Sequence, residues 1–107
     1  MFPEKALLSA VRVTLFTRPG CGLCDAAKHT VAQMQMRRPF DYSEVDIMAP
    51  RNRQWKDIYD FDMPVPHVQS VQSRKGQTEL SDPKKLFHRF TEQEVEQLVD
   101  EAERSAL

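Results

Sequence analysis

The 107-residue sequence contains only two cysteines, Cys21 and Cys24, and only three glycines. So few cysteines exclude a disulfide framework, and their C-x-x-C spacing indicates redox chemistry or metal binding instead. No apolar run approaches the roughly 20 residues that a membrane-spanning helix needs. The formal net charge is −1, so composition indicates neither nucleic acid nor a membrane surface as a partner.

Residues 1–10 also lack the long apolar stretch of a secretory signal, and they contain too few arginines for a transit peptide. We interpret them as a short lead-in to the folded domain. A single C-x-x-C with no other cysteine favours a reducing compartment. We therefore expect a cytoplasmic protein, with the mitochondrial matrix as the alternative location.

An apolar fraction of 40% over this length indicates one globular domain, residues 1–107. Apolar periodicity predicts an α/β fold in the order β-α-β-α-β-β-α, with a four-stranded mixed sheet flanked by helices. The first two strands should be parallel because a helix joins them, and the last two antiparallel because only a loop joins them. The predicted strands are residues 11–17, 40–47, 65–71 and 86–90.

Three local patterns refine this prediction. The segment 72–85 is polar and rich in turn-forming residues, so we interpret it as a long hairpin-loop insertion. Pro66 cannot donate a hydrogen bond to a β-ladder, which predicts a position at the start of its strand or on an unpaired edge. Thr91 and Glu94 have the spacing of a capping box, which predicts the start of the last helix.

Helical spacing also predicts which residues of the first two helices are buried or solvated. The first helix should begin at the cysteines and end near residue 36. Trp55, Ile58 and Tyr59 should share one buried face of the second helix. Arg37 and Arg38 follow the first helix, and we interpret them as a solvated helix end.

The cysteines lie in the stretch VRVTLFTRPGCGLCDAAK, residues 11–28, which has the pattern of a strand, a tight turn and a helix. Cys21 then lies at the helix N-terminus, and Cys24 lies one turn further, about 5 Å along the axis. Helix N-termini and nearby cations lower a cysteine pKa from about 8.5 to about 3.5–7.5. The helix end and Arg18 should therefore favour a thiolate at Cys21.

The dipeptide between the cysteines has its own consequences. Gly22 leaves backbone N–H groups accessible, and Leu23 offers an apolar surface beside Cys21 for a protein or peptide partner. C-x-x-C can also be half of a zinc site, but a closed site needs four ligands. We expect no metal, because the remaining candidate ligands, His29, His67 and His88, are poorly placed in the predicted elements.

The element order, the C-x-x-C after the first strand and a proline before the third strand resemble the thioredoxin fold. The run LFTRPGCGLCDAAK is similar to glutaredoxins and, more closely, to glutaredoxin-like proteins, and the resemblance covers roughly residues 11–104. It implies that Cys21 is the nucleophile and Cys24 the resolving thiol. It also implies a cis bond between Met63 and Pro64, with the Met63 backbone beside Cys21 as a docking edge for an extended substrate.

Two features depart from the glutaredoxin pattern. The dipeptide is Gly22-Leu23 where many dithiol glutaredoxins have Pro-Tyr. The Gly-Gly followed by paired acids, which helps to hold glutathione before the last helix, is absent from LFHRFTEQE. Arg18, in contrast, lies where glutaredoxins commonly have a lysine. The departures predict weak glutathione binding.

The leading hypothesis is a thiol–disulfide oxidoreductase that uses the Cys-Gly-Leu-Cys dithiol to reduce protein disulfides or mixed disulfides. The expected partners are disulfide-containing proteins or glutathione as co-substrate, and the resemblance adds a thioredoxin reductase as a reductant. We expect a monomer without a resident cofactor. Two alternatives remain open: a glutathione-dependent iron–sulfur cluster carrier and a redox-inert thioredoxin-like adaptor.

Overall fold

The computed structural model describes residues 10–74 and 76–106, so the predicted lead-in at residues 1–9 lies outside the described residues. No helix in these two ranges is long and apolar enough to cross a membrane. The elements are β1 (Val11–Thr17), α2 (Gly22–Arg37), β2 (Asp41–Asp46), the 3₁₀ helix η1 (Pro50–Asn52), α3 (Arg53–Tyr59), β3 (Val65–Arg74), β4 (Gln77–Leu80), β5 (Lys84–Lys85) and α4 (Glu92–Ala106).

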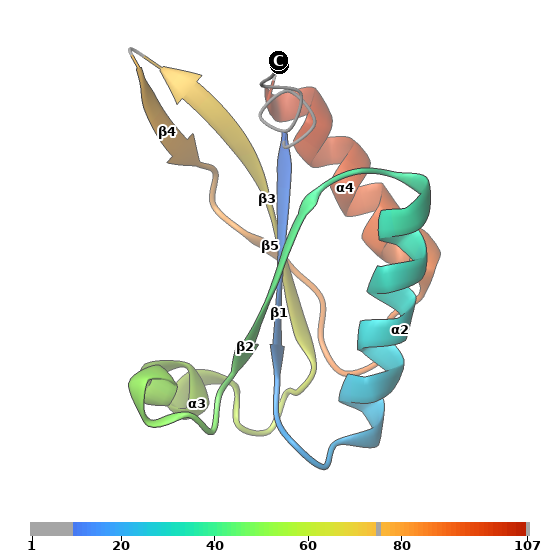
Figure 1. Cartoon of the computed structure of the whole chain (residues 1–107), viewed down its shortest axis with the longest axis vertical. Helices are drawn as coiled ribbons and strands as arrows, with labels where there is room; N and C mark the ends of the chain where they lie inside the picture. The colour runs from blue at the N-terminus through green and yellow to red at the C-terminus, as the bar shows by residue number, and fades with distance from the viewer. Residues whose placement is uncertain (1–9, 75, 107) are drawn as a thin grey trace.

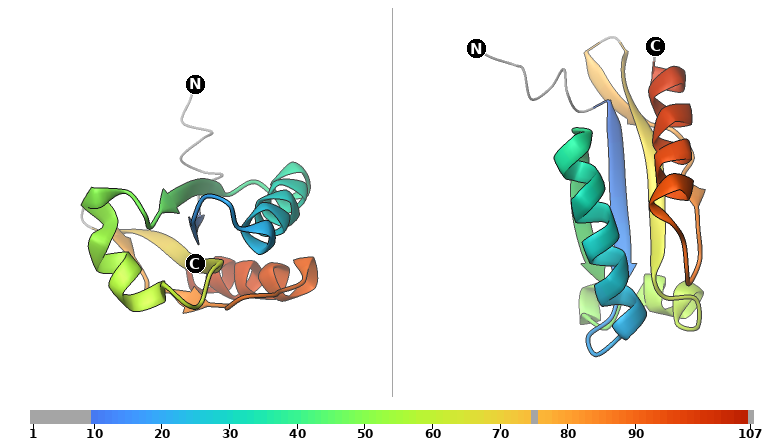
Figure 2. Two further views of the ribbon diagram at one scale, coloured as in Figure 1. Left: turned by 90° about the horizontal axis from the view of Figure 1, so that it is seen from below. Right: turned by 90° about the vertical axis from the view of Figure 1, so that its right-hand side faces the viewer.

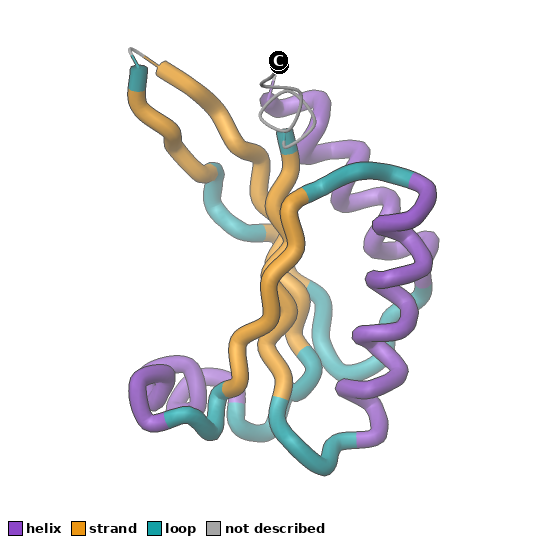
Figure 3. The backbone as a smooth tube through the Cα atoms, in the orientation of Figure 1, coloured by secondary structure: helices purple, strands orange, loops and turns teal. Residues whose placement is uncertain are grey.

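The strands form one mixed sheet in the order β2-β1-β3-β4 (Figures 1 and 3). β1 pairs with β2 in parallel, as the helix that joins them predicted, and it pairs with β3 antiparallel. The position beside β3 is shared, because β4 pairs with residues 71–74 and β5 pairs with residues 67–68. Four strand positions therefore build the sheet, and the predicted α/β thioredoxin-like fold is confirmed.

Helices cover both faces of this sheet. α2 and α4 lie side by side on one face, and α3 lies on the other (Figures 1 and 2). Side chains alternate along β1, so Val11 and Val13 face α2 and α4, whereas Phe16 faces α3. The core under α2 and α4 consists of Val11, Val13, Val31, Met34, Phe40, Val68, Val95, Val99 and Ala102.

A cluster of ion pairs joins the C-terminal end of α2 to α4. Arg38 is bonded to Asp100 and Glu103, and its guanidinium lies 3.7 Å from Glu96. Arg37 is bonded to Glu92 at the start of α4. The prediction of a solvated helix end therefore holds for Arg37, which is exposed, but was wrong for Arg38, which α4 partly buries among its carboxylates.

The segment 72–85 forms a hairpin, but its arms are paired strands and not the predicted loop. β3 continues to residue 74, and β4 and β5 both lie inside the segment. All four β4 residues are exposed, so the strand has no apolar alternation that a sequence pattern could detect. The Ser81 side chain accepts a 2.9 Å hydrogen bond from the Ser70 N–H, which holds the returning chain against β3.

The predicted strand at residues 86–90 is also wrong. His88 has a φ of +58°, which an extended strand does not allow, and the segment crosses from β5 to α4 without pairing. Pro66 is the second residue of β3, near the strand start as predicted, and lies opposite Leu15 on an interior strand. In α3, Tyr59 is buried but Ile58 is 60% exposed, so the predicted shared face is only partly correct.

Removal of the Arg38 guanidinium should weaken the attachment of α4. The Arg38 side chain is 20% exposed, whereas that of Arg37 is 49% exposed. We expect Arg38→Ala to lower the free energy of unfolding by about 1–2 kcal/mol, and Arg37→Ala by less than about 0.5 kcal/mol. Urea unfolding of the two variants measures the difference, and equal losses would contradict this account of the ion-pair cluster.

Candidate active site

The end of β1 and a tight turn place Cys21 at the start of α2. The Ile47 N–H donates a 2.9 Å hydrogen bond to the Thr17 carbonyl, which holds the last residue of β1 beside the chain after β2. Gly20 in the turn has a φ of +71°, a conformation that residues with a Cβ rarely adopt. The chain then enters α2 with Cys21 as the N-cap residue, in an extended conformation.

Cys21 and Cys24 form a disulfide, and their Cα atoms are 5.2 Å apart. The Cys24 backbone N–H donates a 3.1 Å hydrogen bond to the Cys21 sulfur, which thus takes the place of an oxygen at the helix N-cap. Cys24 is 0% exposed, whereas Cys21 is partly exposed. Cys21 is therefore partly open to solvent, and its sulfur accepts a hydrogen bond from the first turn of α2. Cys24 lies in the core.

The two residues between the cysteines lie on the surface. Leu23 is 37% exposed, which makes it an apolar side chain at the mouth of the dithiol. Gly22 is also exposed, and a Cβ added to it would meet nothing within 4 Å. The surface beside Cys21 is thus open at Gly22 and apolar at Leu23.

The Met63–Pro64 bond is cis, and Met63 belongs to the same core cluster as Cys24, with Cys21 packed against it. Among the described residues, the Met63 backbone N–H and C=O have no hydrogen-bond partner. Met63 is only 6% exposed, so little of the predicted docking edge is open to solvent. The His88 N–H donates to the carbonyls of Asp62 and Pro64, at 3.3 and 3.1 Å.

Arg18 is directed to the end of α3. It forms an ion pair with Asp60, which also accepts a 3.1 Å hydrogen bond from the Lys56 ammonium. Lys56 and, secondarily, Arg18 lower the pKa of the Asp60 carboxyl. In the described part of the chain, no hydrogen bond joins Arg18 to either cysteine, so its effect on Cys21 stays a prediction.

A buried aromatic cluster on the α3 face of the sheet was missed at the sequence level. The Tyr59 hydroxyl and the His67 Nε2 share a 2.7 Å hydrogen bond, and Phe16 lies 4.5 Å from the His67 ring. Burial lowers the pKa of His67 to about 4, with a further contribution from Lys85. His67 is therefore neutral at pH 7, and only tertiary packing reveals its position.

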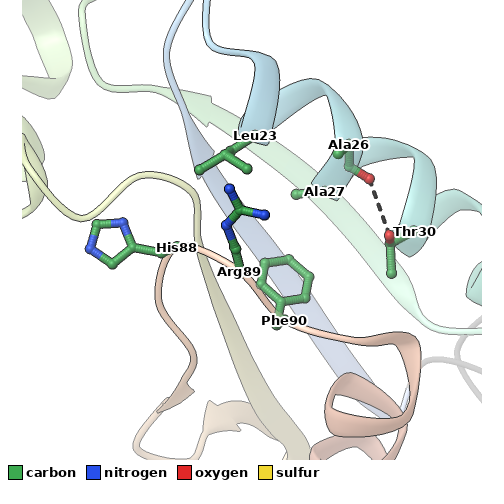
Figure 4. Close-up of a pocket in the computed structure, with 7 residues that line it drawn as sticks. All are labelled: Leu23, Ala26, Ala27, Thr30, His88, Arg89 and Phe90. Atoms are coloured by element: carbon green, nitrogen blue, oxygen red, sulfur yellow. Dashed lines mark hydrogen bonds between the residues drawn. The ribbon is translucent and has the colours of Figure 1, made fainter.

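A shallow pocket of about 220 Å³ opens beside the dithiol, between α2 and the segment before α4 (Figure 4). The sequence pattern predicted Leu23 as part of the site, but the residues on the opposite wall were missed. The only sign of His88, Arg89 and Phe90 in the sequence is that they precede the capping box at Thr91. The pocket is lined by Leu23, Ala26, Ala27, Thr30, His88, Arg89 and Phe90.

The fold and the paired cysteines at the first turn of α2 define a thioredoxin-fold protein. A thioredoxin mutant from Halobacterium salinarum is similar in structure, with a TM-score of 0.64, 13% identity and coverage of 92% of this chain and 80% of that one. Thioredoxin from Fasciola hepatica gives a TM-score of 0.58 at 14% identity, with 92% and 88% coverage. At these identities the likeness concerns the fold alone.

Residues 12–100 match the family described as Glutaredoxin-like domain (DUF836), and the chain belongs to this family. A curated relative, the Glutaredoxin-like protein YDR286C homolog of Dictyostelium discoideum, is 35% identical over 60 residues. That match covers 52% of this chain and 56% of the relative, so the chain spans little more than half of that protein's length. The resemblance that the sequence motifs indicated is confirmed at the level of the family.

The low pKa of His67 has a consequence for acid stability. Its folded value of about 4 lies below the ordinary 6.5, so the unfolded state binds more protons between these values. The folded state therefore keeps its full stability with respect to His67 above about pH 6.5. It loses free energy of unfolding as the pH falls toward 4, because the unfolded state gains the proton first. We expect His67 to contribute about 2–3 kcal/mol to the loss of unfolding free energy over this range.

Urea unfolding at several pH values measures this slope. His67→Gln should flatten the slope between pH 6.5 and 4, even where the variant is less stable at every pH. His29→Gln, which alters an exposed histidine on α2, is the matched control and should keep the wild-type slope. A His67→Gln slope equal to that of the wild type would show that His67 is not held neutral by the fold.

Proposed function

We propose that this protein is a thiol–disulfide oxidoreductase that reduces disulfides or mixed disulfides of proteins through Cys21 and Cys24. The observation that carries the proposal is the hydrogen bond from the Cys24 N–H to the Cys21 sulfur, at 3.1 Å. This N–H and the helix dipole stabilise a thiolate on the more exposed sulfur, and a thiolate is the reactive form in exchange. A buried second thiol then resolves the adduct.

The reaction needs two exchanges. The Cys21 thiolate attacks a substrate sulfur, a new S–S bond forms, and the substrate disulfide breaks with its electron pair on the departing thiolate. Cys24 then loses its proton and attacks the Cys21 sulfur, which releases the second substrate thiolate and leaves the Cys21–Cys24 disulfide. A small thiol or a dithiol protein supplies the two electrons that reduce the protein again.

Substrate is held by the surface around the attacking sulfur. Leu23 gives apolar contact beside Cys21, and the Met63 backbone offers an N–H and a C=O to an extended segment. The Pro64 carbonyl is occupied by the His88 N–H, so the edge is one residue long. We infer that most of the binding comes from side-chain contacts on either side of this edge.

The first test separates the roles of the two thiols. Cys21→Ser should abolish dithiothreitol-driven reduction of insulin disulfides, because the attacking sulfur is gone. Reduced Cys24→Ser, mixed with insulin in the absence of dithiothreitol, should form a mixed disulfide that persists, because the resolving thiol is gone. Insulin precipitation measures the rates, and non-reducing mass spectrometry identifies the adduct and the cysteine that carries it.

Arg104→Ala, at an exposed position in the last turn of α4, is a control that should react like the wild type. Adducts formed through Cys24, or full activity in Cys21→Ser, would reverse the assignment of roles. Failure of the wild type to accelerate insulin reduction would contradict the proposed function and favour the redox-inert adaptor.

The second test concerns glutathione. The segment before α4 has no Gly-Gly, and the Glu94 N–H is already bonded to the Thr91 hydroxyl at 3.0 Å. The Thr91 N–H is likewise bonded to the Glu94 carboxylate at 2.8 Å. Two backbone donors at this helix start are therefore occupied, and we expect poor binding of the γ-glutamyl end of glutathione.

The glutathione-coupled hydroxyethyl disulfide assay measures this. We expect kcat/KM about tenfold or more below that of an ordinary dithiol glutaredoxin, the loss that one or two missing hydrogen bonds produce. An equal kcat/KM would show that other residues bind glutathione. The same purified protein, prepared without oxygen, tests the iron–sulfur alternative through the visible absorbance of a bound cluster.

A further inference from the structure

The pocket between α2 and residues 88–90 starts at the dithiol. Leu23, which lies between the two cysteines in the chain, forms one end of it, and Thr30 lies two turns further along α2. The distance from Leu23 to Thr30 along the helix axis is about 10 Å, for seven residues at about 1.5 Å each. About three residues of an extended peptide span this length.

Arg89 supplies the charge in this pocket. Its side chain rises from the segment before α4, and its guanidinium lies between Leu23 and Ala27 (Figure 4). Arg18, Arg37 and Arg38 all form ion pairs, but Arg89 has no hydrogen bond or ion pair among the described residues. Among the described residues, Arg89 is thus an exposed cation without a partner, and it shares a pocket with Leu23 of the C-x-x-C motif.

The neighbouring charges leave Arg89 free for a ligand. The nearest titratable neighbour in the chain, His88, also lines the pocket, but its ring lies 3.8 Å from the Asp62 carboxylate and is directed away from Arg89 in Figure 4. The capping box occupies the Thr91 and Glu94 N–H groups, so the end of α4 offers no donors at these positions. Arg89 is the arginine among the residues that line the pocket, and its guanidinium is available to an anion there.

The surroundings of the pocket favour a polypeptide over a small polar anion. Leu23, Ala26, Ala27 and Phe90 make most of the lining apolar. Leu23, which lies between the two cysteines, is 37% exposed and forms part of this apolar lining. An extended protein segment can cover these side chains and reach Arg89, whereas a small anion would meet only the guanidinium.

We propose that this pocket binds the polypeptide segment around the substrate cysteine, and that Arg89 selects substrates with an acidic residue within about three positions of that cysteine. The proposal rests on the proposed function, because it names the substrate class of the same dithiol. Arg89 is a specificity-determining residue in this scheme and takes no part in bond exchange.

The experiment uses three short peptides that each contain a single cysteine as a mixed disulfide with neutral 2-thiopyridine. They differ only in the residues within three positions of the cysteine, which are Asp, Asn or Lys. Attack of the Cys21 thiolate on the peptide sulfur breaks the S–S bond and releases thiopyridone, whose absorbance gives the rate. The reduced protein is used in excess, so no other reductant is needed.

Wild-type protein should react about two- to fivefold faster with the Asp peptide than with the Asn peptide, and slowest with the Lys peptide. This is the range for a solvent-exposed ion pair. The preference should shrink at high salt, where such pairs are screened. Arg89→Lys should keep the order of the three peptides, and Arg89→Glu should reverse it.

Arg104→Glu is the matched control, because it changes the net charge equally at an exposed position in the last turn of α4. It should keep the wild-type order. Equal rates for all three peptides in the wild type, or an unchanged order in Arg89→Glu, would overturn the inference while leaving the proposed function intact. No thiopyridone release from any peptide would contradict the proposed function itself.

A fourth probe distinguishes a polypeptide from glutathione. The mixed disulfide of glutathione with 2-thiopyridine carries carboxylates but lacks an extended segment. It should react more slowly than the Asp peptide. A faster reaction, lost in Arg89→Glu, would identify the pocket as a glutathione site and overturn the polypeptide assignment.

Discussion

The hydrogen bond from the Cys24 N–H to the Cys21 sulfur ties the chemistry of the site to the start of α2. The sulfur is the N-cap of the helix, so its position follows from where the helix lies. Val31 and Met34 hold α2 in the core shared with α4, and Cys24 holds its first turn in the core shared with α3. Two separate cores therefore position one exposed sulfur atom.

The start of α2 and the loop that contains Met63 pack together at Cys21. The His88 N–H joins the segment before α4 to the loop that contains Met63 and Pro64. In the aromatic cluster under α3, burial lowers the pKa of His67, so its ring is neutral at pH 7. The ring and the Tyr59 hydroxyl therefore share a hydrogen bond without a buried charge. Arg89 lies in the pocket that Leu23 also lines, where the proposed polypeptide substrate would meet it.

Local signals in the sequence predicted the parts of the fold that depend on local physics. β1 has the predicted bounds, the cysteines begin α2, and the Thr91–Glu94 capping box begins α4. β4 was missed because it is an edge strand with no buried face, formed only by its pairing with β3. The positions of Arg38 and Arg89 depend on how α4 and its preceding segment pack against α2, and no local pattern contains that information.

The proposed reaction requires that the start of α2 make Cys21 a thiolate near neutral pH. Titration of the reduced Cys24→Ser protein, followed by the ultraviolet absorbance of the thiolate, measures the pKa of Cys21 without interference from the second thiol. This requirement predicts a pKa below about 7.5, the range found at helix N-termini. A pKa of about 8.5 or higher, the value of an unperturbed cysteine, would contradict it.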